Sequence, residues 1–271
     1  MKEDSLTPVH NLHISGTPQC DKSEILSHCS ASSAAKSKIL PLRPSMSANY
    51  ASGSATRLVD FYGRDFVITS DVLIPRPETE MVVDAVLSLC GKSYLPGVKP
   101  SVPKLPQDCS ILDVGTGSGC IAITLKLELP ESAITACDIS KKALAIARKN
   151  AHRLKAKMEF VESDLIGSVD GDYDIIVANL PYVDENWDWI DKEALSVEPS
   201  LALYAEDGGL ALIKRLIGQV SECKIPYLIL EADPCQHERV IEYTGTHNYQ
   251  LLETRGFCLV FENREYYNLV A

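Results

Sequence analysis

The sequence predicts an α/β fold with a mostly parallel seven-stranded sheet and a C-terminal antiparallel hairpin. Three observations carry this prediction: strand-like and helical segments alternate, a glycine turn follows the first buried strand, and two apolar runs are joined through Arg-Gly near the C-terminus. Strands connected by helices of this length are parallel neighbours, because each helix has to cross back over the sheet and pack on it.

The alternating segments follow one another from residue 109 to the C-terminus. Short runs rich in β-branched residues read as strands, and longer runs with a 3.6-residue apolar period read as helices. The expected strands are 109–114, 132–138, 158–163, 173–178, 226–232, 249–254 and 257–263, and the expected helices are 119–129, 140–154, 208–220 and 234–243. The last two strands form the antiparallel hairpin.

The chain before residue 109 has two parts of different composition. Residues 1–56 are rich in Ser, Ala and Pro and have no sustained period, so we expect a low-complexity or loosely helical, poorly ordered segment; a small helical domain is the alternative. Residues 58–74 read as a short β-hairpin and residues 81–90 as a helix. The compact domain is therefore expected to span residues 57–271.

Composition narrows the class of protein. Hydrophobic residues make up 45% of the chain and charged residues 23%, and no apolar run approaches the roughly eighteen residues that span a bilayer. The formal net charge of −11 disfavours a nucleic acid partner. The nine cysteines are an odd number without metal-ligand spacing, which favours a reducing compartment and no metal site. We expect a cytoplasmic monomer that acts on a protein or a small molecule.

The glycine turn predicts a ligand cradle. Gly115, Gly117 and Gly119 lie between the first buried strand and its helix, where unpaired backbone amides meet a ligand. The GxGxG spacing departs from the GxGxxG of dinucleotide-binding proteins. Asp138 closes the second strand, so its carboxylate is expected to accept both hydroxyls of a ribose above the turn. Asp164, after the third strand, is placed to accept from an adenine amine.

The motif Asn-Leu-Pro-Tyr, residues 179–182, ends the fourth strand and opens into the same crevice. A planar amide or aromatic amine is a poor nucleophile, so it must be held close to a methyl group and in line with it. Asn179 and the backbone carbonyl of Leu180 are expected to accept its two N–H groups, with Pro181 fixing the carbonyl direction. Tyr182 offers a flat face to the target. Catalysis then rests on orientation and exclusion of water.

These motifs, with LIPRPETE at residues 73–80, resemble the S-adenosylmethionine-dependent protein-(glutamine-N5) methyltransferases that modify peptide chain release factors. The resemblance runs from about Tyr62 to the C-terminus and includes segments at 197–210 and 231–240 that are similar to the family's EPxxAL and E-x-x-x-x-Q elements. It implies a Rossmann-like class I methyltransferase fold, S-adenosylmethionine as methyl donor with S-adenosylhomocysteine as product, and a glutamine in the GGQ loop of a release factor as target.

The resemblance also implies residue roles. Gly115, Thr116, Gly117 and Gly119 border the methionine part of the donor, Asp138 the ribose, and Asp164 and Leu165 the adenine. Asn179, Leu180, Pro181 and Tyr182 contact the substrate glutamine, Asn179 also borders the donor, and Asn179, Pro181 and Tyr182 carry catalysis. Pro75, Arg76, Pro77, Glu78 and Thr79 wall the pocket. A structural interpretation is also available, in which the two prolines end a strand and open a helix.

Two departures leave alternatives open. Leu180 replaces the first proline of the family's usual NPPY, as in adenine-N6 methyltransferases that act on ribosomal RNA, so an adenine-N6 methyltransferase for rRNA or DNA is the second hypothesis. Residues 1–56 do not resemble the family's N-terminal five-helix domain. A relative that binds the donor without turnover is the third hypothesis, and the retained Asn179, Pro181 and Tyr182 oppose it.

Overall fold

The computed structural model describes residues 56–92 and 105–266. The expectation for residues 1–56 falls almost entirely outside these residues. Every helix among the described residues falls short of the length and apolar character needed to cross a membrane.

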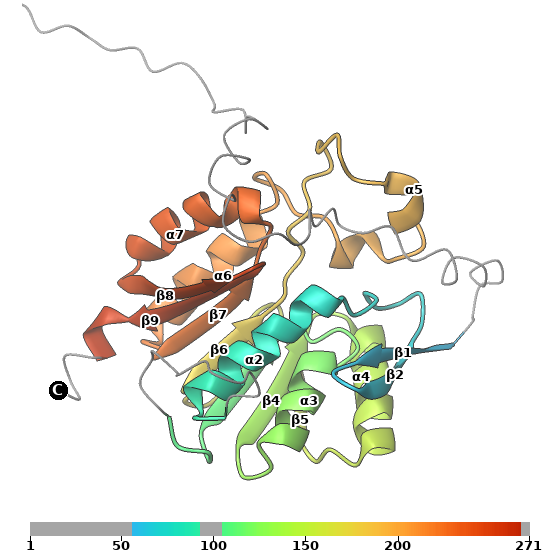
Figure 1. The fold of residues 1–271 in the computed structure, drawn as a ribbon, viewed down its shortest axis with the longest axis horizontal. Helices are drawn as coiled ribbons and strands as arrows, with labels where there is room; N and C mark the ends of the chain where they lie inside the picture. The colour runs from blue at the N-terminus through green and yellow to red at the C-terminus, as the bar shows by residue number, and fades with distance from the viewer. Residues whose placement is uncertain (1–55, 93–104, 267–271) are drawn as a thin grey trace, which may run out of the picture. The chain divides into compact units, whose positions relative to one another are not determined.

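A seven-stranded mixed sheet forms the centre of the described domain, in the order β5-β4-β3-β6-β7-β9-β8 (Figure 1). Its first five strands in the sequence pair in parallel, and the last two form an antiparallel hairpin on β7. The strands are β3 (Ser110–Val114), β4 (Ala133–Asp138), β5 (Glu159–Glu162), β6 (Ile175–Ala178), β7 (Tyr227–Glu231), β8 (Tyr249–Arg255) and β9 (Cys258–Asn263). The predicted sheet and its terminal hairpin are confirmed.

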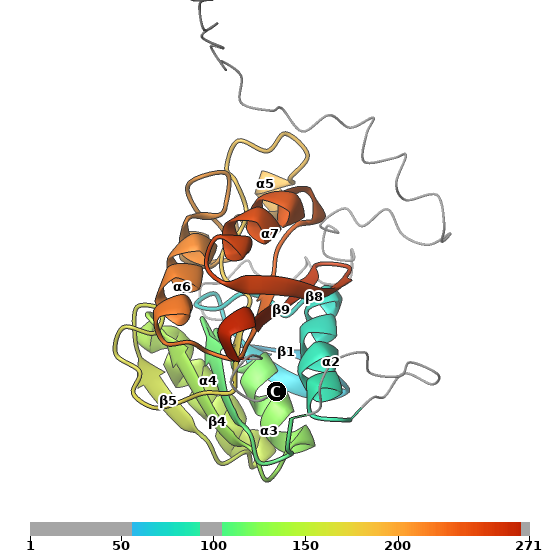
Figure 2. The ribbon, with the colours of Figure 1, turned by 90° about the vertical axis from the view of Figure 1, so that its left-hand side faces the viewer.

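Helices cover both faces of this sheet (Figure 2). Successive residues of a central strand face opposite layers: Ile175 and Val177 join the core beneath α2 and α3, whereas Ile176 and Ala178 join the core beneath α6 and α7. This is why the parallel strands read as continuous apolar runs. The helices are α2 (Glu80–Leu89), α3 (Cys120–Glu128), α4 (Lys141–Leu154), α6 (Ala211–Glu222) and α7 (His237–Gly245).

A separate two-stranded hairpin, β1 (Arg57–Phe61) and β2 (Arg64–Ile68), packs against α4 and is tied to the glycine turn by one buried side chain. The amide of Asn150 on α4 accepts from the backbone N–H of Val67 at 2.8 Å and donates to the carbonyls of Val67 and Ser118 at 3.0 and 2.9 Å. This buried amide therefore fixes the hairpin, the helix and the glycine turn relative to one another.

The structure corrects one local expectation and adds short elements that no periodicity indicated. The prolines of residues 73–80 do not end a strand: β2 stops at Ile68, where its partner β1 has no further residue to pair. Pro77 instead opens a 3-10 turn, η2 (Pro77–Thr79), which leads into α2. The other short elements are α5 (Lys192–Leu195) and η3 (Ser200–Ala202), whereas η4 (Pro234–Gln236) is the first turn of the helix predicted over 234–243.

Candidate active site

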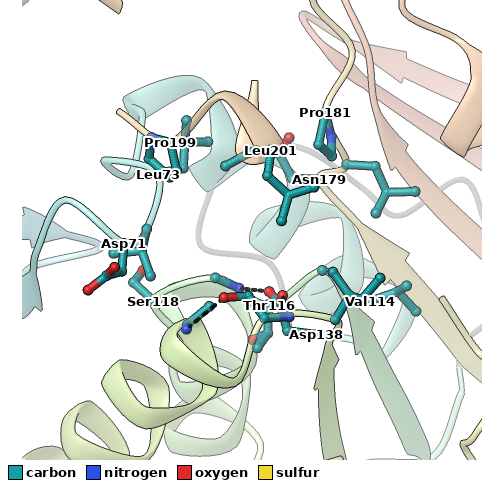
Figure 3. A pocket seen from close by; sticks show the side chains of 18 of the residues that line it. Asp71, Leu73, Val114, Thr116, Ser118, Asp138, Asn179, Pro181, Pro199 and Leu201 are labelled. Atoms are coloured by element: carbon teal, nitrogen blue, oxygen red, sulfur yellow. Dashed lines mark hydrogen bonds between the residues drawn. The ribbon is translucent and has the colours of Figure 1, made fainter. Parts of the chain in front are cut away.

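A cavity of about 550 Å³ opens at the carboxyl ends of β3, β4 and β6. The chain order reverses at this point, since β4 and β6 flank β3 on opposite sides, and parallel α/β sheets bind ligands at such a switch point. Thr116 and Asp138 lie on one side of the cavity, and Asn179, Pro199 and Leu201 lie on the opposite side (Figure 3).

Most of the residues predicted from the sequence line this cavity. They are Pro75, Thr79, Gly115, Thr116, Gly117, Asp138, Asp164, Leu165, Asn179, Leu180 and Pro181. Arg76, Pro77, Glu78, Gly119 and Tyr182 do not line it.

The three glycines of the turn all have positive φ, but they meet different surroundings. A Cβ on Gly119 would lie 2.7 Å from Ile123 Cδ1 and 3.2 Å from Ala147 Cβ, so this glycine allows α3 and α4 to pack closely. A Cβ on Gly117 would approach no atom more closely than 4.0 Å, because this glycine faces the cavity. The turn thus offers bare backbone to a ligand at Gly117 and close packing at Gly119.

Asp138 is held by the backbone around it. Its Oδ2 accepts from the N–H of Gly117 at 2.9 Å, and its Oδ1 accepts from the N–H of Ser140 at 2.8 Å. Ser140, not Asp138, caps α4 through its side chain. Each carboxylate oxygen keeps a lone pair for a further donor. Burial raises the pKa of Asp138, and the backbone N–H groups oppose that rise.

Asp164 lies at the outer end of the cavity and already has a cationic neighbour. Its Oδ2 accepts from Arg215 Nη2 at 2.8 Å, and both side chains are about half exposed. Leu165, which follows it, has a φ of +51° and is buried. Ile139, next to Asp138, also lines the cavity and is 54% exposed. Arg215 and Ile139 are cavity residues that sequence reasoning missed.

The carboxamide of Asn179 is held at the opposite side by a residue far away in the sequence. Its Nδ2 donates to Oγ1 of Thr79, 3.1 Å away, at the end of η2. Thr79 is buried and Asn179 is half-buried. The NH₂ group of Asn179 is thereby engaged by the protein, which leaves its carbonyl oxygen as the acceptor.

Tyr182 turns away from the cavity and is fixed at both its hydroxyl and its carbonyl. The hydroxyl donates to Oε1 of Glu231 at 3.1 Å, and the backbone carbonyl accepts from Nε2 of Gln236 at 2.8 Å. Glu231 and Gln236 are the two polar residues of the E-x-x-x-x-Q element, so this spacing places both against Tyr182. Burial, followed by the charge of Glu231, raises the pKa of Tyr182.

Two buried carboxyl groups were not identified from the sequence as parts of the site. Burial raises the pKa of Glu231, at the end of β7, to about 7, and contacts with Thr79, Tyr182 and Asn179 oppose the rise. Burial likewise raises the pKa of Asp113, at the base of the glycine turn, to about 7. Asp113 accepts from the Thr116 hydroxyl at 2.7 Å. The sequence did contain a signal for Glu231, because it ends the strand next to β6, which Asn179 follows directly.

The segment before α2 is anchored by an ion pair. The guanidinium of Arg76 binds the carboxylate of Glu198, which also accepts from the backbone N–H of Ile74 at 2.9 Å. Glu198 belongs to the segment at 197–210, so the LIPRPETE and EPxxAL-like elements meet here. Pro75 and Thr79 reach the cavity wall, while Arg76 supports it from behind.

Comparisons with known proteins agree on the class. The family model described as "Methyltransferase small domain" matches residues 98–213. Two solved structures have similar folds: a 16S rRNA N2 G1207 methyltransferase from T. thermophilus (TM-score 0.55, 14% identity, 79% of this chain and 51% of that one) and a methyltransferase from Pyrococcus furiosus (TM-score 0.52, 16% identity, 74% and 90%). The described domain therefore has the fold of a class I methyltransferase.

Curated relatives narrow the class to a family. The release factor glutamine methyltransferase of Koribacter versatilis is 42% identical over 217 residues, which cover 76% of this chain and 71% of that protein. The enzyme of the same description from Chlorobaculum tepidum is 43% identical over 156 residues, 55% of this chain and 50% of that protein. The chain belongs to the release factor glutamine methyltransferase family, and it spans between half and about 70% of the length of these two relatives.

Proposed function

We propose that this chain transfers a methyl group from S-adenosylmethionine to the side-chain amide nitrogen of a glutamine in the GGQ loop of a peptide chain release factor. The observation that carries the proposal is the held carboxamide of Asn179, whose free carbonyl oxygen stands at the wall of a cavity that also contains the glycine turn. A cytoplasmic location fits a substrate that takes part in translation.

The residues around the glycine turn fit the methyl donor, which supplies an electrophilic methyl group on a sulfonium. Gly117 leaves open space at its α-carbon, and Asp138 is an acceptor for ribose hydroxyls at the end of the next strand. The cavity volume lies within the usual range of small-molecule sites. Gly115, Thr116, Gly117 and Asp138 form what we call the donor side, with Asp164, Leu165 and Ile139 beside the adenine.

Asn179, Leu180 and Pro181, supported by Thr79, Tyr182 and Glu231, form what we call the substrate side. The amide nitrogen of glutamine is weakly nucleophilic, because its lone pair is delocalised into the carbonyl group. Asn179 Oδ1 and the Leu180 carbonyl accept its two N–H groups, which turns the lone pair toward the methyl group. The catalytic contribution is therefore orientation and exclusion of water.

Methyl transfer from labelled S-adenosylmethionine tests the proposal directly. The protein is incubated with purified release factor, with the same release factor carrying Gln→Glu in its GGQ loop, and with ribosomal RNA. Label in the first substrate and not in the second is the expected result. Label in RNA alone would establish the adenine-N6 alternative, and donor binding without any transfer would establish the binding-only alternative.

A further inference from the structure

The carboxamide of Asn179 has two orientations that differ only by exchange of its oxygen and its NH₂ group. Only one of them presents an acceptor to the N–H of a substrate amide. In the structure, Nδ2 donates to Thr79 Oγ1, which is the productive orientation for the proposed function. A hydroxyl both donates and accepts, however, so Thr79 alone does not determine which end of the amide faces it.

A buried carboxyl next to Thr79 resolves this ambiguity. Glu231 is 1% exposed, and its Oε2 has no hydrogen-bond partner among the described residues, while Oε1 accepts from Tyr182. The register of β6 and β7 pairs Ala178 with Leu230, so Asn179 and Glu231 follow at the ends of neighbouring strands. The side chains of Thr79, Tyr182 and Asn179 all lower the pKa of this buried carboxyl. An ionised carboxylate only accepts, so it favours the orientation in which the NH₂ group of Asn179, and not its oxygen, lies on the side of Thr79 and Glu231. It also attracts the Thr79 proton, which leaves the oxygen lone pairs of Thr79 for that NH₂ group.

We propose that Glu231 is a positioning residue that fixes the orientation of the Asn179 carboxamide, both directly and through the Thr79 hydroxyl. The inference rests on the proposed function and adds to it a reason for the buried charge. The same carboxylate accepts from Tyr182, so it orders both ends of the Asn-Leu-Pro-Tyr motif. Glu231 does not line the cavity, which separates this role from that of a base acting on the substrate.

Three variants and one control test whether Glu231 and Thr79 orient the Asn179 carboxamide. Thr79→Val keeps the side-chain shape but removes the hydroxyl, Thr79→Ser keeps the hydroxyl, and Glu231→Gln replaces the acceptor by a group that also donates. Glu262 provides the matched control, because it is a buried glutamate on β9, paired opposite Tyr227 at the other end of β7. Calorimetric binding of S-adenosylhomocysteine and thermal unfolding report whether each variant is folded.

We expect Thr79→Val and Glu231→Gln to lower kcat for release factor methylation by about 10- to 100-fold, as for misorientation of a reacting group. Donor affinity and KM for the release factor stay within about twofold. Thr79→Ser recovers most of the activity, and Glu262→Gln behaves like the unmodified protein. In the unmodified protein, kcat rises with pH as the carboxyl ionises, and this rise is missing in Glu231→Gln.

Four other titratable groups interact with Glu231, namely Glu78, Tyr182, Cys120 and Cys258. The rise in kcat is therefore assigned to Glu231 only by comparison with the pH dependence of kcat in Glu231→Gln. Three results overturn the inference while the unmodified protein is active: full activity in Thr79→Val, full activity in Glu231→Gln, or a loss of donor binding that matches the loss of kcat. No transfer by the unmodified protein would overturn the proposed function instead.

Discussion

The two sides of the cavity are assembled from contacts of very different sequence separation. On the donor side, Gly117 and Asp138 are 21 residues apart: Gly117 lies in the turn after β3, and Asp138 ends the neighbouring strand β4. On the substrate side, Asn179 and Thr79 are 100 residues apart, and Tyr182 and Glu231 are 49 apart. The contact between Gly117 and Asp138 therefore needs only the pairing of β3 and β4, whereas the contacts of the substrate side also need the start of α2 and the end of β7.

This difference predicts that the two sides are separable by mutation, and the largest effect belongs to the substrate side. Asn179→Ala removes the acceptor that orients the target nitrogen, so methyl transfer is expected to fall by at least about 1,000-fold, comparable to loss of a main electrostatic contact in an active site. Affinity for S-adenosylhomocysteine is expected to stay nearly intact. Labelled transfer and calorimetry measure the two quantities. Equal loss of both would contradict the division into two sides.

Within the donor side, Gly119 and Gly117 are expected to differ, because the first serves packing and the second serves donor binding. Gly119→Ala forces a left-handed backbone on alanine and drives its Cβ into Ile123, so unfolding free energy is expected to fall by about 2–4 kcal/mol. Gly117→Ala meets no such contact and is expected to cost only about 1 kcal/mol of stability. The methyl group of the new alanine at position 117 extends into the cavity, so this variant is expected to bind the donor more weakly. Chemical denaturation and calorimetry on both variants test this contrast, which fails if Gly117→Ala is the less stable of the two.

Asp138→Ala is expected to weaken donor binding by about 1.5–3 kcal/mol, as for loss of charged hydrogen bonds. Part of this loss is indirect, because Asp138 also holds the Gly117 N–H. The methylation rate at saturating donor is expected to stay close to that of the unmodified protein. A fall in this rate as large as that of Asn179→Ala would show that the donor side also orients the target.

Each side contains one buried carboxyl, and both predict a pH effect on stability. Burial raises the pKa of Asp113 and of Glu231 to about 7, from ordinary values of 3.8 and 4.5. Between those limits the folded state holds protons that the unfolded chain has released, so stability is greatest at low pH and declines as pH rises toward 7. Well above pH 7 both carboxyl groups are ionised in the folded and the unfolded state, and stability falls no further on their account.

The test compares urea unfolding at pH 5.5 and pH 8. Asp113→Asn and Glu231→Gln are each expected to remove on the order of 1–3 kcal/mol of the decline. Only Glu231→Gln is expected to impair methyl transfer. A pH dependence of stability that is unchanged in both variants would place the titrating groups elsewhere.

The sequence predicted the sheet and the proximity of Gly117 and Asp138 for a physical reason. Apolar runs and helical periods identify the strands, and the ends of adjacent parallel strands necessarily share one crevice, so Gly117 and Asp138 come together without further information. The Thr79 contact with Asn179 depends on how α2 packs, which no local period encodes. Segments as short as α5 carry too few residues to show a helical period. Glu231 was overlooked because a buried carboxyl looks in sequence like any other polar residue that ends a strand.

The smallest expected effect concerns the outer end of the donor side. Asp164 is about half exposed and shares its carboxylate with Arg215, so solvent and the guanidinium both weaken what it offers a ligand. Asp164→Asn is expected to reduce donor affinity only about two- to fivefold, less than 1 kcal/mol. Arg215→Gln frees the carboxylate and provides the control, with donor affinity equal to or above that of the unmodified protein. If Asp164→Asn weakened binding as much as Asp138→Ala, the adenine contact would rank equally with the ribose contact, and the local backbone hold on Asp138 would no longer explain the strength of the donor side.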